Sequence, residues 1–165
     1  MKYHRGEIIF RQGETGNLFR LHTGLLKVVR LREDGTPFLF NILTPGEVFP
    51  HHSLLSPQPC HGTAIALVTS EVERIPAAAW YESLEENPYQ YREAALLLQK
   101  TLRKIQERIS MVTAHREDRI EGLRQWLARY FPDHPIEKML TQEEMGQLLG
   151  ISRETVNRLL NGKRR

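Results

Sequence analysis

Residues 141–161 read TQEEMGQLLGISRETVNRLLN, and this stretch decides the fold of the C-terminal part of the chain. Thr141 is a good N-cap because its hydroxyl can accept an unpaired backbone N–H, and Glu144 completes a capping box three residues later. Gly150 can take the left-handed conformation that ends a helix. Ser152 then offers a second N-cap. The stretch therefore predicts a helix, a glycine turn and a second helix.

The apolar and small residues of this stretch have the spacing of a helix-turn-helix. Such a unit needs a small residue inside the first helix, a glycine at the bend and apolar residues on both inner faces. These positions are held by Gly146, Gly150, Ile151, Val156 and Leu159. We expect Ile151 to be a buried plug between the two helices.

The outer face of the second helix carries polar and charged side chains near its N-terminal end. Recognition helices meet base edges at this place in the major groove, where arginine suits guanine and a carboxylate can accept from the cytosine amino group. Five basic residues and one acidic residue between positions 150 and 165 give this end a net charge of +4. The stretch therefore predicts DNA binding; the alternative is an ordinary helical hairpin with a solvated charged face.

The run from Ser152 to Arg158, SRETVNR, resembles the S-R-E-T-V-x-R signature of the cyclic-AMP receptor protein/fumarate-nitrate regulator (Crp/Fnr) family of bacterial transcription factors. The resemblance implies that Arg153, Glu154 and Arg158 read bases, and that Ser152 and Thr155 contact phosphate. We expect the basic C-terminal residues to contact phosphate as well. The predicted DNA-binding residues are Ser152, Arg153, Glu154, Thr155, Asn157, Arg158, Lys163, Arg164 and Arg165.

Length and composition limit the class of protein. A chain of 165 residues with 40% hydrophobic and 26% charged residues fits one or two small globular domains. The net charge of +3 permits nucleic-acid binding without requiring it. One cysteine, Cys60, excludes a disulfide framework within the chain, and no apolar run approaches a membrane span. Because no signal-peptide region follows Met1, we expect a cytoplasmic protein.

Residues 7–75 have the composition of a β-rich domain. Four glycines recur every 11 residues, between short runs rich in β-branched and aromatic residues. Regular turn signals at this spacing predict a sandwich or barrel of short strands. Asp34 and Gly35 predict a type I′ hairpin turn, because both residue types tolerate positive φ. The glycines are Gly13, Gly24, Gly35 and Gly46, and the clearest strand candidates are residues 7–10, 25–29, 38–42, 63–68 and 71–75.

Three segments of this half, residues 10–14, 22–28 and 43–49, resemble the signatures of a cyclic-nucleotide-binding jelly roll. Members that bind nucleotide hold the ribose with a glycine and a glutamate, and the cyclic phosphate with an arginine. Our alignment places Pro50, His51 and Cys60 at these positions. Without the arginine, the phosphate loses charge-assisted hydrogen bonds worth about 1.5 to 3 kcal/mol each. The cassette is degraded, and we do not expect a response to cyclic AMP.

The segment that replaces the cassette is rich in histidine. Imidazole and thiolate are the usual ligands of zinc and haem, so one hypothesis is that this loop senses a metal, haem-bound gas or redox state. The alternative is a polar surface loop with solvated histidines, since the spacing matches no zinc signature. One cysteine cannot supply the four thiolates of an iron–sulfur cluster. The candidate effector-binding residues are His51, His52, Cys60 and His61.

A long helix is expected from about residue 89 to residue 114, after a short helix at residues 76–84. Its apolar positions are separated alternately by 4 and 3 residues, which is the heptad seam of a coiled coil. We predict a homodimer, which would place two recognition helices on half-sites about 34 Å apart in an inverted repeat. The alternative is that the stripe packs on the β-rich domain. The seam consists of Tyr91, Ala95, Leu98, Leu102, Ile105, Ile109 and Val112.

The predicted fold is α+β, in three parts: a β-roll sensor domain at residues 1–87, a dimerisation helix at 88–114 and a helix-turn-helix domain at 115–165. The last part begins with a new helix at residue 115, whose apolar residues complete a small core. Family members normally continue into a two-stranded wing, whereas this sequence stops at Arg165. We therefore expect a marginal DNA-binding domain whose affinity depends strongly on salt.

The favoured function is a homodimeric transcription regulator with double-stranded DNA and RNA polymerase as partners. The competing hypothesis is a haem, metal or small-molecule sensor whose truncated DNA-binding domain serves protein contacts. No spacing in the sequence is typical of an acid–base pair or a nucleophile dyad, so an enzyme is not predicted.

Overall fold

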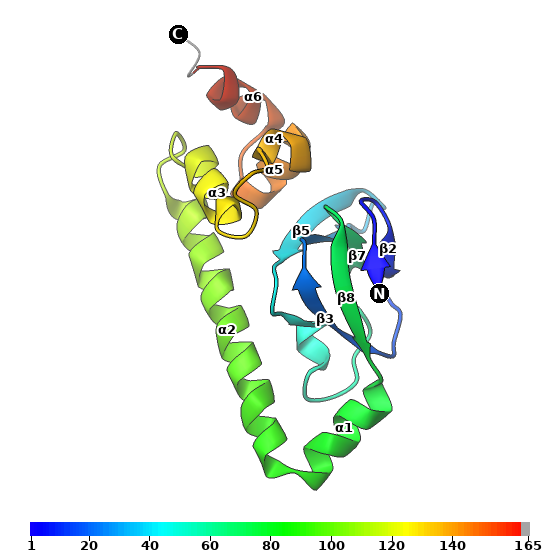
Figure 1. The fold of residues 1–165 in the computed structure, drawn as a ribbon. Helices are drawn as coiled ribbons and strands as arrows, with labels where there is room; N and C mark the ends of the chain where they lie inside the picture. The colour runs from blue at the N-terminus through cyan, green and yellow to red at the C-terminus, as the bar shows by residue number, and fades with distance from the viewer. Residues whose placement is uncertain (163–165) are drawn as a thin grey trace.

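The computed structural model describes residues 1–162 and places a β-sandwich, here called the roll, beside one long helix and a cluster of short helices (Figure 1). In this part of the chain eight strands form two four-stranded antiparallel sheets, with orders β1-β8-β3-β6 and β2-β7-β4-β5. The predicted α+β class is confirmed. The strands are β1 (Lys2–Tyr3), β2 (Ile8–Phe10), β3 (Leu18–Thr23), β4 (Leu26–Leu31), β5 (Pro37–Leu43), β6 (Val48–Phe49), β7 (Thr63–Ala66) and β8 (Ser70–Ile75).

Aromatic and branched residues fill the space between the two sheets. Phe10 comes from one sheet and Phe19 and Phe49 from the other, with ring centroids 5.6 to 5.9 Å apart. Successive side chains of a strand point to opposite faces, so alternate positions of each strand supply this core. The predicted sandwich of short strands is therefore correct.

The connection between β4 and β5 corrects one turn prediction. Gly35 has a φ of 79°, but no other residue type among residues 1–162 has positive φ, so Asp34 does not adopt the conformation of a type I′ turn. Instead the Asp34 carboxylate accepts the backbone N–H of Thr36 at 2.9 Å. The backbone N–H of Arg32 donates to the carbonyl of Thr36 at 2.9 Å and closes a longer loop. The backbone N–H of Gly35 also donates to the carbonyl of Arg32 at 2.9 Å, so the turn lies one residue earlier than predicted, across Glu33 and Asp34.

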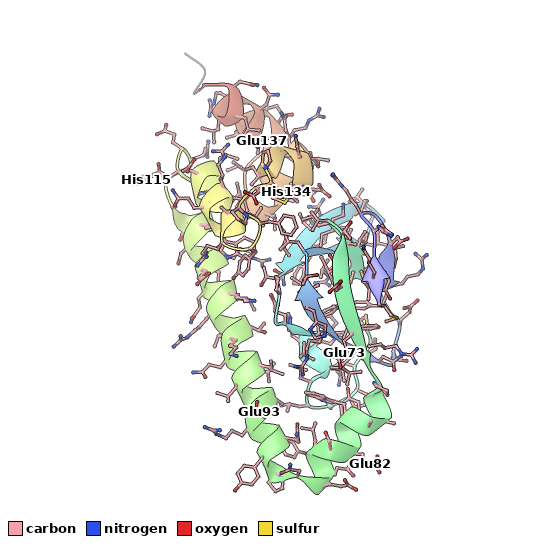
Figure 2. All side chains as sticks on the ribbon, in the orientation of Figure 1. Glu73, Glu82, Glu93, His115, His134 and Glu137 are labelled. Atoms are coloured by element: carbon pink, nitrogen blue, oxygen red, sulfur yellow. The ribbon has the colours of Figure 1, made fainter. Side chains whose placement is uncertain are left out.

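The helices follow the sandwich. They are α1 (Ala77–Glu86), α2 (Pro88–Thr113), α3 (Arg119–Ala128), α4 (Ile136–Met139), α5 (Gln142–Leu149) and α6 (Arg153–Gly162), with a short 3-10 helix, η1 (His51–Ser53), in the roll. Asn87 separates α1 from α2 in an extended conformation, as expected for a residue before proline. The helix predicted from residue 115 begins later, at Arg119, and His115 lies in the connection after α2 (Figure 2). No helix within residues 1–162 is both long enough and apolar enough to span a membrane.

The long helix α2 has distinct faces. One face meets the roll, with Ala94 and Thr101 buried. The predicted seam is mostly exposed, with Leu102 at 55% and Ile109 at 54%, whereas its Leu98 is half-buried and packs on a cluster that includes residues of the roll. The alternative in which this stripe packs on the β-rich domain therefore holds for Leu98 but not for Leu102 and Ile109.

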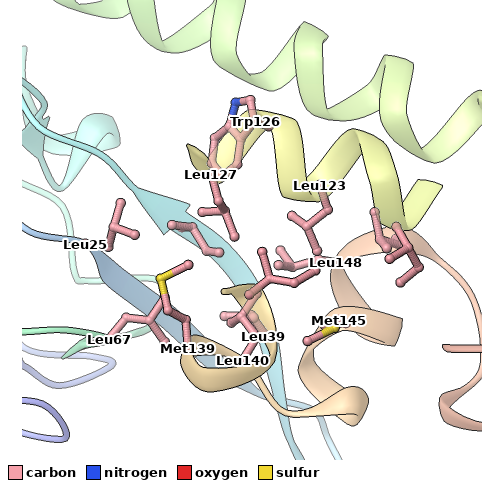
Figure 3. Packing of buried hydrophobic residues seen from close by; sticks show 14 of the residues in the cluster. Leu25, Leu39, Leu67, Leu123, Trp126, Leu127, Met139, Leu140, Met145 and Leu148 are labelled. Carbon is pink, nitrogen blue, oxygen red and sulfur yellow. The ribbon is translucent and has the colours of Figure 1, made fainter. Parts of the chain in front are cut away.

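A single apolar cluster joins the roll to the helices that follow α2. Loops and strands of the roll contribute one side of this cluster, and α3, α4 and α5 contribute the other (Figure 3). The side chains labelled on the roll side are Leu25, Leu39 and Leu67, and those on the helical side include Leu123, Leu127, Met139 and Leu148. The helical part is thus docked on the roll, and α6 lies on the side away from both sheets (Figure 1).

Polar contacts border the apolar cluster. The Nζ atom of Lys27 lies 2.6 Å from Oε1 of Glu144, and Oε1 of Gln147 accepts the backbone N–H of Leu39 at 2.6 Å. Arg5 donates to the carbonyl of Lys138 at 2.8 Å. We call these three interactions the docking contacts.

Candidate functional sites

The start of α5 is fixed by the capping box that the sequence predicts. The Thr141 hydroxyl accepts the backbone N–H of Glu144 at 3.1 Å, and the Glu144 carboxylate accepts the backbone N–H of Thr141 at 2.9 Å. Two of the donors that a helix N-terminus leaves unpaired are thereby satisfied. Gly150 ends α5 with φ 63° and ψ 38°, the left-handed conformation expected of it.

The turn brings α5 and α6 close together at Gly146. A Cβ atom at this position would lie only 2.6 Å from the carbonyl oxygen of Ile151, so the first helix requires glycine here. Val156 and Met145 are fully buried beneath the turn. Ile151 packs against the same core but is only half-buried, so the expectation of a buried plug was too strong.

The predicted DNA-binding residues lie mostly on the exposed face of α6. Ser152, Arg153, Glu154, Asn157 and Arg158 are exposed. A face without cover at the N-terminal end of α6 has the geometry of a recognition surface. Lys163, Arg164 and Arg165 lie outside the described residues.

Two of these polar side chains also hold the helix-turn-helix together. The Ser152 hydroxyl accepts the backbone N–H of Thr155 at 3.2 Å and caps α6, and Thr155 itself is half-buried. The side-chain amide of Asn157 donates to Gln142 on α5 at 3.1 Å. Hydrogen bonds from its own backbone and from Ser152 lower the pKa of the Glu154 carboxyl, which is therefore ionised near neutral pH.

Arg119 is a structural residue that the sequence did not single out. Its Nε donates to the carbonyl of Ala114 at 3.1 Å, and its Nη1 donates to the carbonyl of Leu149 at 3.0 Å. These carbonyls lie at the C-terminal ends of α2 and α5, where acceptors are unpaired and positive charge is favourable. Arg119 thus links the long helix to the helix-turn-helix. Its partners are backbone groups, which carry no signal in the sequence.

A pocket opens on the roll where the histidine-rich segment lies. It has a volume of about 80 Å³ and is lined by apolar residues such as Phe40 and Phe49 and by His51, His52 and His61. The rings of His52 and His61 stack with centroids 4.0 Å apart. Burial, despite a hydrogen bond to the carbonyl of Pro59, lowers the pKa of His52. Three of the four candidate effector residues therefore share one pocket.

Cys60 and His51 have other neighbours. Cys60 is buried in the sandwich core, and burial raises the pKa of its thiol to about 11, so it stays protonated. Nε2 of His51 lies 2.9 Å from Oε2 of the buried Glu47. Within residues 1–162, no three histidine, cysteine, aspartate or glutamate side chains are grouped so that they could hold a metal ion.

Glu47 links this pocket to α2. Its carboxylate accepts from the backbone N–H and the hydroxyl of Thr44, both at 2.8 Å, and from Nζ of Lys104 at 2.8 Å. Burial alone would raise the pKa of Glu47, but His51 and Lys104 outweigh it and lower that pKa to about 2. The carboxylate is therefore charged, and Lys104 also donates to Thr44.

Comparison with known families matches both parts of the chain. Residues 1–87 match the model of the cyclic nucleotide-binding domain, and residues 94–164 match that of the Crp-like helix-turn-helix domain. The chain belongs to the Crp/Fnr family of transcription regulators. As a Crp/Fnr regulator it binds DNA through its helix-turn-helix and is not an enzyme.

Individual Crp/Fnr proteins resemble the chain over most of its length. The CRP-like cAMP-activated global transcriptional regulator of Mycobacterium tuberculosis is 27% identical over 96% of this chain and 74% of its own. The transcriptional activator protein anr of Pseudomonas aeruginosa is 25% identical over 94% of this chain and 66% of its own. A CRP-family regulator of known structure from Thermus thermophilus superposes with a TM-score of 0.80 at 24% identity, covering 100% of this chain and 84% of that one. The structural likeness supports the fold.

Proposed function

We propose that this Crp/Fnr regulator binds an inverted-repeat operator as a homodimer and that cyclic AMP is not its effector. The observation that carries the proposal is the exposed seam of α2. Leu102, Ile105 and Ile109 are large apolar side chains that face solvent in a single chain. A heptad stripe of this kind is buried when a second copy of the helix packs against it.

In a homodimer, the exposed faces of two α6 helices can recognise two half-sites of one operator. One recognition helix reaches only a few base pairs, whereas two helices related by a dyad read half-sites about 34 Å apart. In such a dimer Arg153, Glu154 and Arg158 contact base edges, and Ser152 and Thr155 contact phosphate. Lys163, Arg164 and Arg165 add phosphate contacts, which makes the affinity sensitive to salt. We also propose that RNA polymerase is a partner of this regulator and that the regulator is cytoplasmic.

The pocket on the roll supports independence from cyclic AMP. Among its lining residues there is no lysine or arginine. Cys60, which the alignment places where nucleotide-binding members have the arginine, is buried in the sandwich core. A cyclic phosphate would therefore meet no cationic fork from this segment. The second candidate is a haem, metal or small-molecule sensor. The pocket that His51, His52 and His61 share would be its site, although the described residues place no three metal ligands together there.

The dimer proposal is tested by adding charge to the seam. Replacing Leu102 and Ile105 by aspartate places charges where the two helices would pack, so we expect a monomer with roughly 100-fold weaker operator binding. Sedimentation gives the oligomeric state, and DNA selected from a random pool, with and without cyclic AMP, gives the operator affinity. The matched control is Leu96→Asp with Ser110→Asp, which adds two charges at exposed positions of α2 away from the seam and its flanking positions.

The outcomes separate the competing functions. The proposal is supported if the control variant binds an inverted-repeat operator tightly and the seam variant loses operator binding. A monomeric seam variant that binds equally well would contradict it. If no sequence is enriched from the pool and the purified protein carries haem or metal, the sensor alternative replaces it.

A further inference from the structure

Another pocket lies between α2, the turn before β6 and the residues that follow α3, apart from the histidine-lined pocket. We call it the α2 groove. Its volume is about 350 Å³, within the range of about 300 to 1,000 Å³ in which small-molecule sites fall. The residues that matter for its chemistry are Pro45, Val48, Leu97, Lys100, Arg103 and Tyr130.

The acidic side chains that line the α2 groove are paired with basic ones, but two of its basic side chains have no acidic partner among residues 1–162. Its two carboxylates are paired within the protein, since Glu47 lies 2.8 Å from Lys104 and Glu107 lies 2.9 Å from Arg129. Lys100 and Arg103 also line the groove, one helical turn apart on α2. Neither of them forms an ion pair with any of residues 1–162. The groove therefore presents two cations without an acidic partner.

The remaining wall of the α2 groove is apolar and aromatic. Leu97 is half-buried and offers carbon surface beside the cations, and the buried Val48 lies beneath this wall. The ring of Tyr130 is held in place by Trp126, with ring centroids 5.7 Å apart, and by Lys104, 5.7 Å from its centroid. A pocket with an apolar wall and a few convergent polar groups is typical of a small-molecule site.

We propose that the α2 groove binds a phosphorylated small molecule, with its phosphate on Lys100 and Arg103 and its remaining part against Leu97 and Tyr130. A phosphate monoester carries about two negative charges near neutral pH, which matches two free cations. Arginine pairs with phosphate through two parallel hydrogen bonds, and lysine acts as a point charge.

The position of the α2 groove gives such a ligand a regulatory role. The groove is lined by the roll, by α2 and by Tyr130 of the helical part, so a bound molecule contacts all three. A ligand that contacts docked parts together stabilises their arrangement. Glu47 and Lys104 form part of the groove wall, and His51 connects them to the other pocket.

The probes are AMP, ribose 5-phosphate and adenosine, titrated into the full chain by calorimetry at low salt. We expect AMP to bind at least about tenfold more tightly than adenosine, because adenosine lacks the charge-assisted hydrogen bonds of the phosphate. Ribose 5-phosphate that binds like AMP assigns the site to sugar phosphates, and weaker binding assigns it to nucleotides. Adenosine that binds as tightly as AMP, or no binding of either phosphate, overturns the proposal.

Variants locate the site. Lys100→Gln with Arg103→Gln should weaken AMP binding about tenfold or more. The matched control is Arg92→Gln with Arg116→Gln, which removes two exposed cations outside the groove. Equal affinities of the two double variants would place the phosphate elsewhere and overturn the assignment. Operator binding is measured separately, so a negative result here leaves the proposed DNA recognition intact.

Discussion

At the scale of single residues, Glu47 is a charged group inside the protein. Its side chain is 7% exposed, and its carboxylate is surrounded by Thr44, Lys104 and His51. A buried carboxylate is tolerated only when it is paired and hydrogen-bonded, because leaving water costs several kcal/mol. The stability of the roll therefore depends on these partners staying together.

Replacing Glu47 by glutamine should destabilise the protein by about 3 to 5 kcal/mol, since Lys104 loses its buried counter-charge. Urea unfolding at pH 7 measures the loss. The control is Glu73→Gln on β8, whose side chain is 52% exposed beside Arg20 and His22 (Figure 2). An exposed pair contributes at most about 1 kcal/mol, so equal losses in both variants would contradict this account.

The low pKa of the Glu47 carboxyl predicts that the free energy of unfolding decreases at acid pH. The pKa of Glu47 is lowered in the folded protein from 4.5 to about 2. Its contribution is therefore complete above pH 4.5 and is lost as the pH falls through about 2, where the folded protein binds the proton. The stability difference between wild type and Glu47→Gln should shrink over this range in urea titrations. A difference that stays constant down to pH 2 would show that the charge of Glu47 is not responsible.

Individual residues differ in how far the sequence predicts them. Thr141 and Gly150 were predicted correctly because a cap and its helix are neighbours in the chain. The turn type at Asp34 was wrong because the backbone turn closes one residue earlier, from Arg32 to Gly35, and places the positive φ at Gly35 alone. The partners Glu47 and Lys104 are 57 residues apart, and no local pattern indicates their pairing.

At the scale of elements, the first turn of α5 both starts that helix and contacts the roll. Thr141→Ala should cost about 1 kcal/mol, the usual loss for an N-cap, in chemical denaturation. The control is Thr113→Ala at the end of α2, where the exposed hydroxyl donates to the carbonyls of Ile109 and Ser110 in its own helix. If both alanine variants lose the same free energy, the capping box is not what stabilises α5.

The elements themselves were predicted unevenly. The heptad spacing on α2 identified an apolar face, whereas the buried positions Ala94 and Thr101, which meet the roll, give no apolar period. The short helix α4 follows Pro135 and was missed, since four residues are too few for a periodic signal. Strand β3 was not among the strand candidates, although Leu18 and Leu21 are fully buried.

At the scale of the whole molecule, the docking contacts cover an open sheet edge. β5 is the last strand of its sheet, and its Leu39 backbone N–H donates to Gln147 of α5. An unpaired edge donor would otherwise face water or another chain. The apolar cluster and the polar contacts thus act together in holding the helix-turn-helix on the roll. This arrangement joins residues more than 100 positions apart, so no local pattern in the sequence indicated it.

Removing the Gln147 side chain tests the docking directly. Gln147→Ala should speed hydrogen exchange of the Leu39 amide by roughly 5- to 10-fold, because one hydrogen bond contributes about 1 kcal/mol. Exchange followed by NMR gives the rate for this amide. Gln125→Ala on α3 is the control, since that side chain donates to Glu121, one turn earlier on the same helix. Unchanged exchange at Leu39 would mean that docking persists without this contact.

The leucines shared by the roll and the helix-turn-helix limit how the regulator can move. A DNA-binding domain that has its own hydrophobic core can tilt by small angles. A DNA-binding domain that shares its core with the roll must either stay docked or expose that core to water. Any effector that repositions α6 has to supply the free energy of that exposure. Each molecule should therefore switch between two operator affinities in one abrupt step, without passing through a graded series of tilts.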